Sequence, residues 1–226
     1  MHIDLPTSWR FTLALMAAVI FGAPLSYAKE AFNPVKITQV VNIYEAVVSH
    51  PVPSWITSEV DFFDQIEIYR KQQGDGFLIE FIPKGERFEA WSKMLAVQGA
   101  YVPQLKDLPL ERIALSTFQP LAQACGKDNL KSQKIESNES VVTILMLCRA
   151  SPNGPATIGY GANKGEIILK SVHRFKSTFI EIYHEWRGEK FDFDDQSTWP
   201  TPLNTINEMI RRFKTVKISE SKRPFK

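Results

Sequence analysis

The largest concentration of side chains that could take part in chemistry surrounds one histidine near the end of the sequence. His184 and Glu185 stand next to each other, and an acidic run that contains Asp192 and Asp194 follows. An imidazole beside carboxylates can act as a general acid–base pair or hold a metal ion. The sequence therefore offers one candidate hydrolytic site, in which His184 acts with Glu185, Asp192 or Asp194.

The same residues also fit a structural role. Their spacing is not the His-Glu-x-x-His of zinc hydrolases, and no full calcium loop of the EF-hand type is present. On a strand, His184 shares a face with Ile180, Ile182 and Trp186, which predicts a half-buried side chain, and the acidic run fits a solvated turn. We favour the structural interpretation and keep the hydrolase as the alternative. We predict no metal site and no cofactor.

Other functional motifs are missing from the sequence. The glycine-rich stretch 159–165 matches neither phosphate-loop pattern and fits a hairpin turn better, and there is no Gly-x-Ser-x-Gly elbow. His50 and His173 are isolated. A net charge of only +2 argues against nucleic acid as the main partner.

The N-terminus has the pattern of a cleaved signal peptide. A short polar segment ends at Arg10, an apolar run extends from Phe11 to Leu25, and small residues stand at Ser26 and Ala28, where signal peptidase requires them. An uncleaved anchor is the weaker alternative, because the run is shorter than the ~20 residues of a membrane-spanning helix. We predict cleavage between Ala28 and Lys29, no later transmembrane segment, and export to the periplasm or the extracellular space.

Cys125 and Cys148 are the only cysteines. In an exported chain, an isolated pair is most simply one disulfide. Metal binding is the weaker alternative, since neither cysteine has a second cysteine or a histidine at ligand spacing. The disulfide also predicts packing: the helix that ends at Cys125 must lie on the face of strand 141–149 that carries the even-numbered residues. The apolar odd-numbered face needs another cover, for which the C-terminal helix is the candidate.

The remaining pattern predicts strands joined mostly by tight turns, with a few helices. Residues 40–48 fit either a helix or a strand; the strand is favoured, and the conformation of 39–48 stays open. Thr201 is expected to cap the last helix, with Pro202 in its first position. The other predicted elements are a hairpin over 65–82, a helix over 86–97, a helix over 109–125 broken near Pro120, and strands over 141–149, 156–161, 165–175 and 177–186.

These elements predict an α+β fold in a single domain, 29–226, with a largely antiparallel sheet of about six strands and helices packed on it. An ordered core is expected over 39–218 and a basic tail over 219–226. The basic residues near this end complement the dipole of the last helix and keep the chain soluble. A contact with an anionic envelope surface is the alternative.

The sequence as a whole favours an exported, non-enzymatic binding or accessory domain of a bacterium. Its partner would be a protein, an envelope component or a small ligand. The alternative is the secreted hydrolase built on His184. Hydrophobic and charged contents of 44% and 23% are those of an ordinary globular protein and exclude a disordered or fibrous chain.

Overall fold

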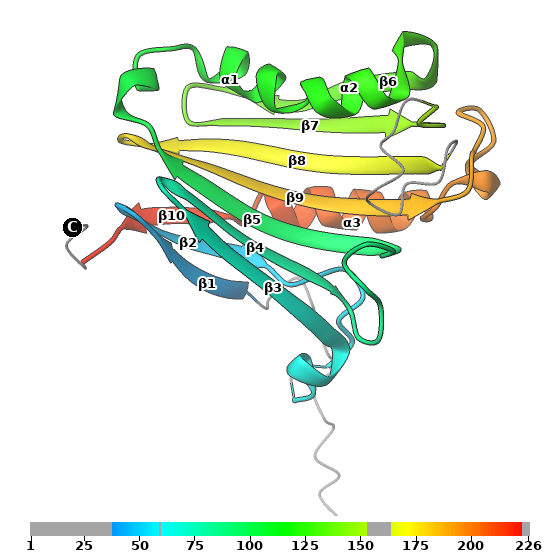
Figure 1. The fold of residues 1–226 in the computed structure, drawn as a ribbon, viewed down its shortest axis with the longest axis horizontal. Coiled ribbons are helices and arrows are strands. Elements are labelled where there is room, and N and C mark those ends of the chain that lie inside the picture. Colours follow the sequence, from blue (N-terminus) through cyan, green and yellow to red (C-terminus); the bar gives the residue numbers. More distant parts are fainter. Residues whose placement is uncertain (1–37, 59, 153–163, 223–226) are drawn as a thin grey trace, which may run out of the picture. The chain divides into compact units, whose positions relative to one another are not determined.

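The computed structural model describes residues 38–58, 60–152 and 164–222, all of which belong to the unit Phe32–Lys226. They form two antiparallel sheets and three α-helices (Figure 1). The seven-stranded sheet has the order β3-β4-β5-β9-β8-β7-β6, and the three-stranded sheet has the order β1-β2-β10. The α+β class is therefore confirmed, but the sequence predicted one sheet of about six strands where the chain builds two.

The strands of the small sheet come from both ends of the described chain: β1 Thr38–Ile43, β2 Ala46–Pro51 and β10 Lys217–Glu220. The strands of the large sheet are β3 Ile66–Gln73, β4 Gly76–Pro83, β5 Lys93–Tyr101, β6 Leu130–Ser137, β7 Val141–Cys148, β8 Gly165–Phe175 and β9 Thr178–Gly188. The helices are α1 Leu110–Thr117, α2 Gln119–Cys125 and α3 Leu203–Phe213.

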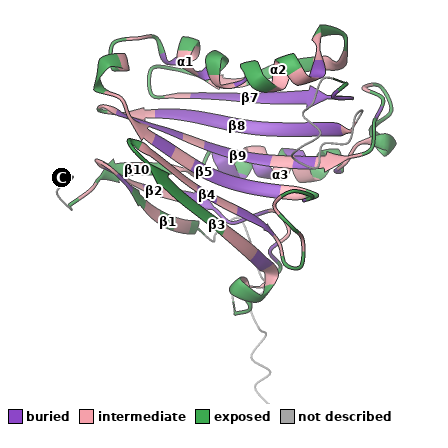
Figure 2. Ribbon diagram, in the orientation of Figure 1, coloured by how far each residue is buried: buried purple, intermediate pink, exposed green. Residues whose placement is uncertain are grey.

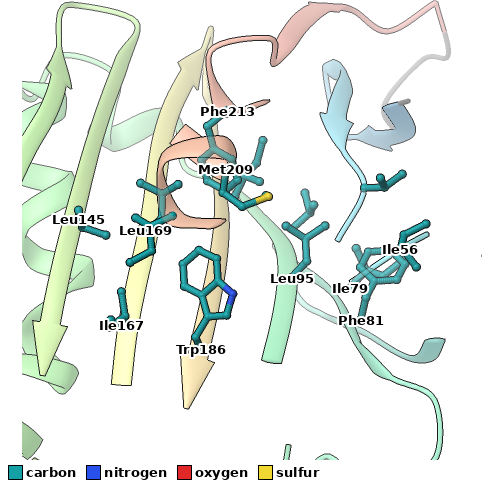
Figure 3. Close-up of a cluster of buried hydrophobic side chains, with 14 of the residues drawn as sticks. Ile56, Ile79, Phe81, Leu95, Leu145, Ile167, Leu169, Trp186, Met209 and Phe213 are labelled. Atoms are coloured by element: carbon teal, nitrogen blue, oxygen red, sulfur yellow. The ribbon is translucent and has the colours of Figure 1, made fainter. Parts of the chain in front are cut away.

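The two faces of the large sheet have different covers. The face that carries Leu95, Leu169 and Ile182, here called the α3 face, packs against α3 and the small sheet. The opposite face, here called the α1–α2 face, packs against α1 and α2. Figure 2 shows the inner strands β7, β8 and β9 as largely buried between these covers. Figure 3 shows Met209 and Phe213 of α3 above Trp186 and Leu169 of the sheet.

The disulfide and its packing consequence agree with the sequence prediction. Cys125 and Cys148 are bonded, with their Cα atoms 5.7 Å apart. Val142, Ile144 and Met146 of β7 lie in one core cluster with the buried residues of α1, while Leu145 and Leu147 lie in the other with those of α3. The helix predicted over 109–125 is two helices that abut at Phe118, with Pro120 in the first turn of the second.

The predicted helix over 86–97 is wrong. This segment is a loop that leads into β5, in which Met94 and Leu95 lie on opposite faces of the sheet. Leu95 packs in one core cluster and Met94 in the other, so both faces of β5 are covered and apolar. Such a strand offers apolar residues at helical spacing as well, and the sequence pattern alone does not separate the two.

Three smaller predictions also need correction. Residues 40–48 are two strands, β1 and β2, joined at Tyr44-Glu45. The tail predicted from residue 219 begins inside β10, whose Glu220 pairs with Lys176. Thr201 does not cap α3, because Pro202 is the N-cap residue and no side chain caps this end. The signal peptide, its cleavage site and the strand predicted over 156–161 lie outside the described residues.

Candidate functional site

The structure places His184 in the core of the domain. Its side chain is fully buried on the α3 face, stacked on Trp186 with ring centroids 4.2 Å apart and met edge-on by Trp55 at 5.6 Å. The backbone N–H of Ser54 donates to Nε2 over 3.2 Å, so the proton of the neutral ring lies on Nδ1. Burial, with the charges of Arg212 and Lys93, lowers the pKa of His184 to about 3. The ring therefore stays neutral at physiological pH and fastens the loop that carries Ser54 and Trp55 to the sheet.

The carboxylates predicted to act with His184 lie elsewhere. Glu185 follows it along β9 and so points to the α1–α2 face, on the other side of the sheet. Asp192 and Asp194 are exposed in the loop after β9, where Asp192 accepts from the backbone N–H of Asp194 over 3.0 Å and Asp194 faces Lys131. The structure thus brings none of the three to the imidazole. Within the described residues, no group of three or more His, Cys, Asp and Glu side chains could hold a metal ion.

Glu185 instead joins a cluster of ionisable side chains on the α1–α2 face. Burial and the charge of Glu185 raise the pKa of Glu166 well above its usual range, although Arg187 lies 3.7 Å away and opposes this shift. Arg187 also covers the ring of Trp91, with its guanidinium carbon 3.6 Å from the ring centroid. Burial raises the pKa of Glu185 as well. The buried carboxyl of Glu166 and the half-buried carboxyl of Glu185 thus form a polar network with Arg187 on strands β8 and β9.

The best candidate site is an apolar groove of about 640 Å³ at the β3 edge of the large sheet. Most of its lining comes from three places: the strand β1, the residues of β3 and β4 that face the same side, and the loop after β2. The lining residues are Thr38, Gln39, Val40, Val41, Asn42, His50, Val52, Ile56, Phe62, Phe63, Ile68, Arg70, Phe77, Ile79 and Phe81. Figure 3 shows Ile79 and Phe81 of β4 beside Ile56. A concave apolar surface with few polar groups is the usual form of a ligand site.

The contributions of the strands show how the groove is built. From β4 come Phe77, Ile79 and Phe81, which alternate along the strand and all point to the α3 face, so they form a floor. From β1 come five consecutive residues, Thr38–Asn42. Side chains of both parities can line one groove only where the groove runs along the edge of the strand. The wall is therefore the outer edge of β1, the last strand of the small sheet.

The groove exists because the small sheet covers only part of the α3 face. That face extends to β3, whereas the small sheet ends with β1. Ile79 and Phe81 are buried at the inner end, while Ile68 and Phe77 on the outer floor are half-buried. The seven strands of the large sheet thus reach further than the strands that cover them.

Close packing fixes the hairpin of β1 and β2 in place beside the groove. A Cβ atom at Gly99 of β5 would lie 2.5 Å from Cγ2 of Ile43 and 3.2 Å from the carbonyl oxygen of Phe179, so only glycine allows this approach. The carboxylate of Glu45 accepts from the backbone N–H of Ser177 over 3.1 Å. The wall of the groove is therefore held by contacts at its far end, next to β5 and β9.

The groove has an exposed apolar mouth. Val40 and Phe63, both part of the lining, are 64% and 72% exposed, and Val60, which shortly precedes Phe63 in the chain, is 86% exposed. Neighbouring exposed apolar side chains mark interaction sites on soluble domains. Sequence reasoning missed this site, although the run Val60-Asp61-Phe62-Phe63 between predicted elements carried a signal.

Two titratable side chains, His50 and Arg70, line the groove beside the uncharged Thr38, Gln39 and Asn42. Burial lowers the pKa of His50 to about 4, and Nδ1 lies 3.0 Å from the carbonyl oxygen of Pro51, so this ring is neutral. Arg70 of β3 is exposed, stands opposite Ile79, and makes no ion pair with the described residues. The groove is consequently apolar with one cation on its floor.

Two smaller hollows are weaker candidates for a ligand site. One of about 360 Å³ lies on the outer strands β3–β5 and β9 and includes Gln98, Phe179 and Glu181. The other, of about 300 Å³, lies beside α3 and contains Glu208 next to Arg212. No helix among the described residues is long and apolar enough to cross a membrane.

Comparisons with known proteins give no functional assignment. No protein-family model and no curated protein matches the sequence. Among solved structures, the Ran-binding protein Mog1p of Saccharomyces cerevisiae is similar with a TM-score of 0.45 and 9% sequence identity, over 80% of this chain and 95% of Mog1p. A mutant of protein Mog1 is similar with a TM-score of 0.44, 9% identity and the same coverage. At this level, neither similarity supports an inference about ligands or partners.

Proposed function

We propose that the protein is an exported, non-enzymatic binding domain whose ligand site is the groove beside β1. The observation that carries the proposal is the apolar floor of the groove together with its exposed apolar mouth, Val40 and Phe63. Apolar surface left open to water costs free energy, and a ligand that covers it recovers that cost. The ligand is thus expected to be predominantly apolar.

The export part of the proposal rests on two further features. The segment before Lys29 has the pattern of a cleaved signal peptide. The Cys125–Cys148 disulfide fits an oxidising compartment. A binding role also agrees with the positions of His184 and Glu185, which lie on opposite faces of one sheet and so do not form an acid–base pair.

The proposal is tested with 8-anilinonaphthalene-1-sulfonate, a fluorescent probe for exposed apolar sites. The mature protein should bind it at one site, and the double variant Val40→Asp, Phe63→Ser should weaken binding by about tenfold or more. Both side chains are largely exposed, so the fold should survive their replacement. Leu115→Ser is the matched control, because Leu115 is 55% exposed on α1, which covers the other face of the sheet.

Equal losses in the groove variant and the control variant would contradict the proposal, as would unchanged binding in both. Near-ultraviolet circular dichroism of each variant shows whether the side chains remain packed, because the probe also binds molten globules. The groove predicts loss of binding in the first variant only, with native packing in all three proteins.

A further inference from the structure

We infer that the occupant of the groove is an extended, largely apolar segment of another polypeptide, which pairs with the outer edge of β1 and places an acidic side chain beside Arg70. This inference rests on the proposed function, since it names the ligand of the same groove.

The edge of β1 has backbone groups available for such a partner. Ile43 and Ala46 flank the two-residue turn and form a pair, followed by Asn42 with Val47, Val41 with Val48, and so on. The residues next to a two-residue turn exchange hydrogen bonds with each other, and along an antiparallel ladder such pairs alternate with pairs that do not. Val40 and Asn42 therefore direct their N–H and C=O groups away from β2. Within the described chain, no strand pairs with that edge.

A strand is also the ligand shape that fits the geometry. An unpaired strand edge is a template for another strand, and peptide recognition by strand addition combines main-chain hydrogen bonds with pockets for alternate side chains. A strand added next to β1 would become the fourth of the small sheet and would lie over the floor formed by Ile68, Phe77 and Ile79. Every second side chain would then face this floor, so those positions should be apolar except for the one that lies over Arg70.

Charge complementarity specifies the partner further. Arg70 is the only charged side chain in the groove lining, and the described residues supply no acidic partner for it. It lies between Ile68 and Gln72 on the outer strand of the floor, where its guanidinium remains in water. A carboxylate on the occupant would pair with it at small desolvation cost, with the modest gain of a surface ion pair.

The probes are two fluorescein-labelled octapeptides that alternate valine and threonine, with one central valine replaced by aspartate or by lysine, because the valines face the floor that carries Arg70. Binding to the mature protein is measured by fluorescence anisotropy. The acidic peptide should bind on the order of fivefold more tightly than the basic one, as expected for an exposed ion pair. In the variant Arg70→Glu the order should reverse, because the charge at this position has changed sign.

A second pair of variants separates the strand edge from the apolar floor. Val40→Pro removes the outward N–H of Val40 and leaves the ladder with β2 intact, a substitution that edge strands tolerate. Val40→Ala is its control, because it keeps the N–H and loses the larger side chain. Peptide affinity should fall about tenfold in Val40→Pro relative to Val40→Ala. Any loss of 8-anilinonaphthalene-1-sulfonate binding should be similar in the two variants, because both lack the valine side chain.

The outcomes distinguish failure of this inference from failure of the proposed function. If the peptides bind both variants equally, or if peptide charge has no effect, the inference fails while probe binding in the groove still supports the proposed function. If the probe does not bind in the groove, both the inference and the proposed function fail. Sedimentation equilibrium tests whether the occupant is instead a second copy of this chain. If the protein forms a dimer that Val40→Pro dissociates, and binds neither peptide, the edge of β1 is a dimer interface and the inference is overturned.

Discussion

Replacing Gly99 by alanine should destabilise the domain by forcing the hairpin of β1 and β2 away from β5. The new methyl group would start 2.5 Å from Cγ2 of Ile43, whereas carbon atoms pack at about 3.5–4 Å, so Ile43 must retreat by about 1 Å. The new methyl group cannot avoid Ile43 by moving the other way, because the carbonyl oxygen of Phe179, which belongs to the sheet, would lie 3.2 Å from it. Overpacking of this size costs about 1–3 kcal/mol of unfolding free energy.

A double-mutant cycle tests that explanation directly. Ile43 is 1% exposed, and Ile43→Ala alone should cost about 2–5 kcal/mol because it leaves a cavity. It also removes the Cγ2 atom that the methyl group introduced by Gly99→Ala would strike, so the double variant should be more stable than the sum of the two losses predicts, by about 1 kcal/mol or more. Urea unfolding of the protein measures all four free energies.

Additive losses in this cycle, within about 0.5 kcal/mol, would refute the close approach of Ile43 to Gly99. Gln98→Ala provides the control, since Gln98 is half-buried on the opposite face of the same strand. Its replacement should leave the coupling energy between positions 43 and 99 unaffected. A confirmed coupling would establish the position of the hairpin that forms the groove wall.

Three further predictions concern pH, redox state and processing. Burial and the charge of Glu185 raise the pKa of Glu80 to about 7, so ionised Glu80 destabilises the fold at pH values above its unfolded-state pKa. Glu80→Gln should therefore raise the unfolding free energy by about 1–2 kcal/mol near pH 8, a figure reduced for the partial exposure of this side chain. Near pH 4 the same variant should leave the unfolding free energy unchanged. Urea titrations at both pH values check this, and an equal gain at each would contradict it. Replacing Cys125 and Cys148 by serine should cost about 3 kcal/mol in the same assay, and dithiothreitol should affect only the wild type. Mass spectrometry of exported protein should give a chain that begins at Lys29; a retained leader would rule out the predicted cleavage.

Much of the fold could be predicted because strong local patterns agreed with the tertiary structure. The hairpin of β3 and β4 follows from two β-rich runs around Gly74 and Gly76, and these strands pair as expected. The covers of β7 follow from one covalent constraint: the disulfide assigned α1 and α2 to one face, which left the other for α3.

The failures occurred where tertiary structure supplies the information. β5 lies inside the sheet with both faces buried, so its residues show no alternation that would mark a strand. β10 is only four residues long and is a strand because β2 pairs with it. A basic segment with this composition resembles a solvated tail when it is considered alone.

The candidate site was even less visible in the sequence. The groove depends on how far β3 and β4 extend beyond the small sheet, and no local pattern encodes that difference. His184 attracted attention because imidazoles are common in catalysis. The sequence predicted a half-buried side chain on the face of Ile182 and Trp186, and the structure buries it completely on that face. The alternation of residues along the strand predicted which face carries His184 but did not indicate a ligand site.

The most direct test of the binding groove is an amide chemical-shift map of the ¹⁵N-labelled protein with and without saturating 8-anilinonaphthalene-1-sulfonate. The structure predicts shift changes concentrated in Thr38–Asn42 and at Ile79 and Phe81, which form the wall and floor of the groove. Changes centred instead on Gln98, Phe179 and Glu181, in the smaller hollow of the large sheet, would contradict the assignment of the ligand site to the groove beside β1.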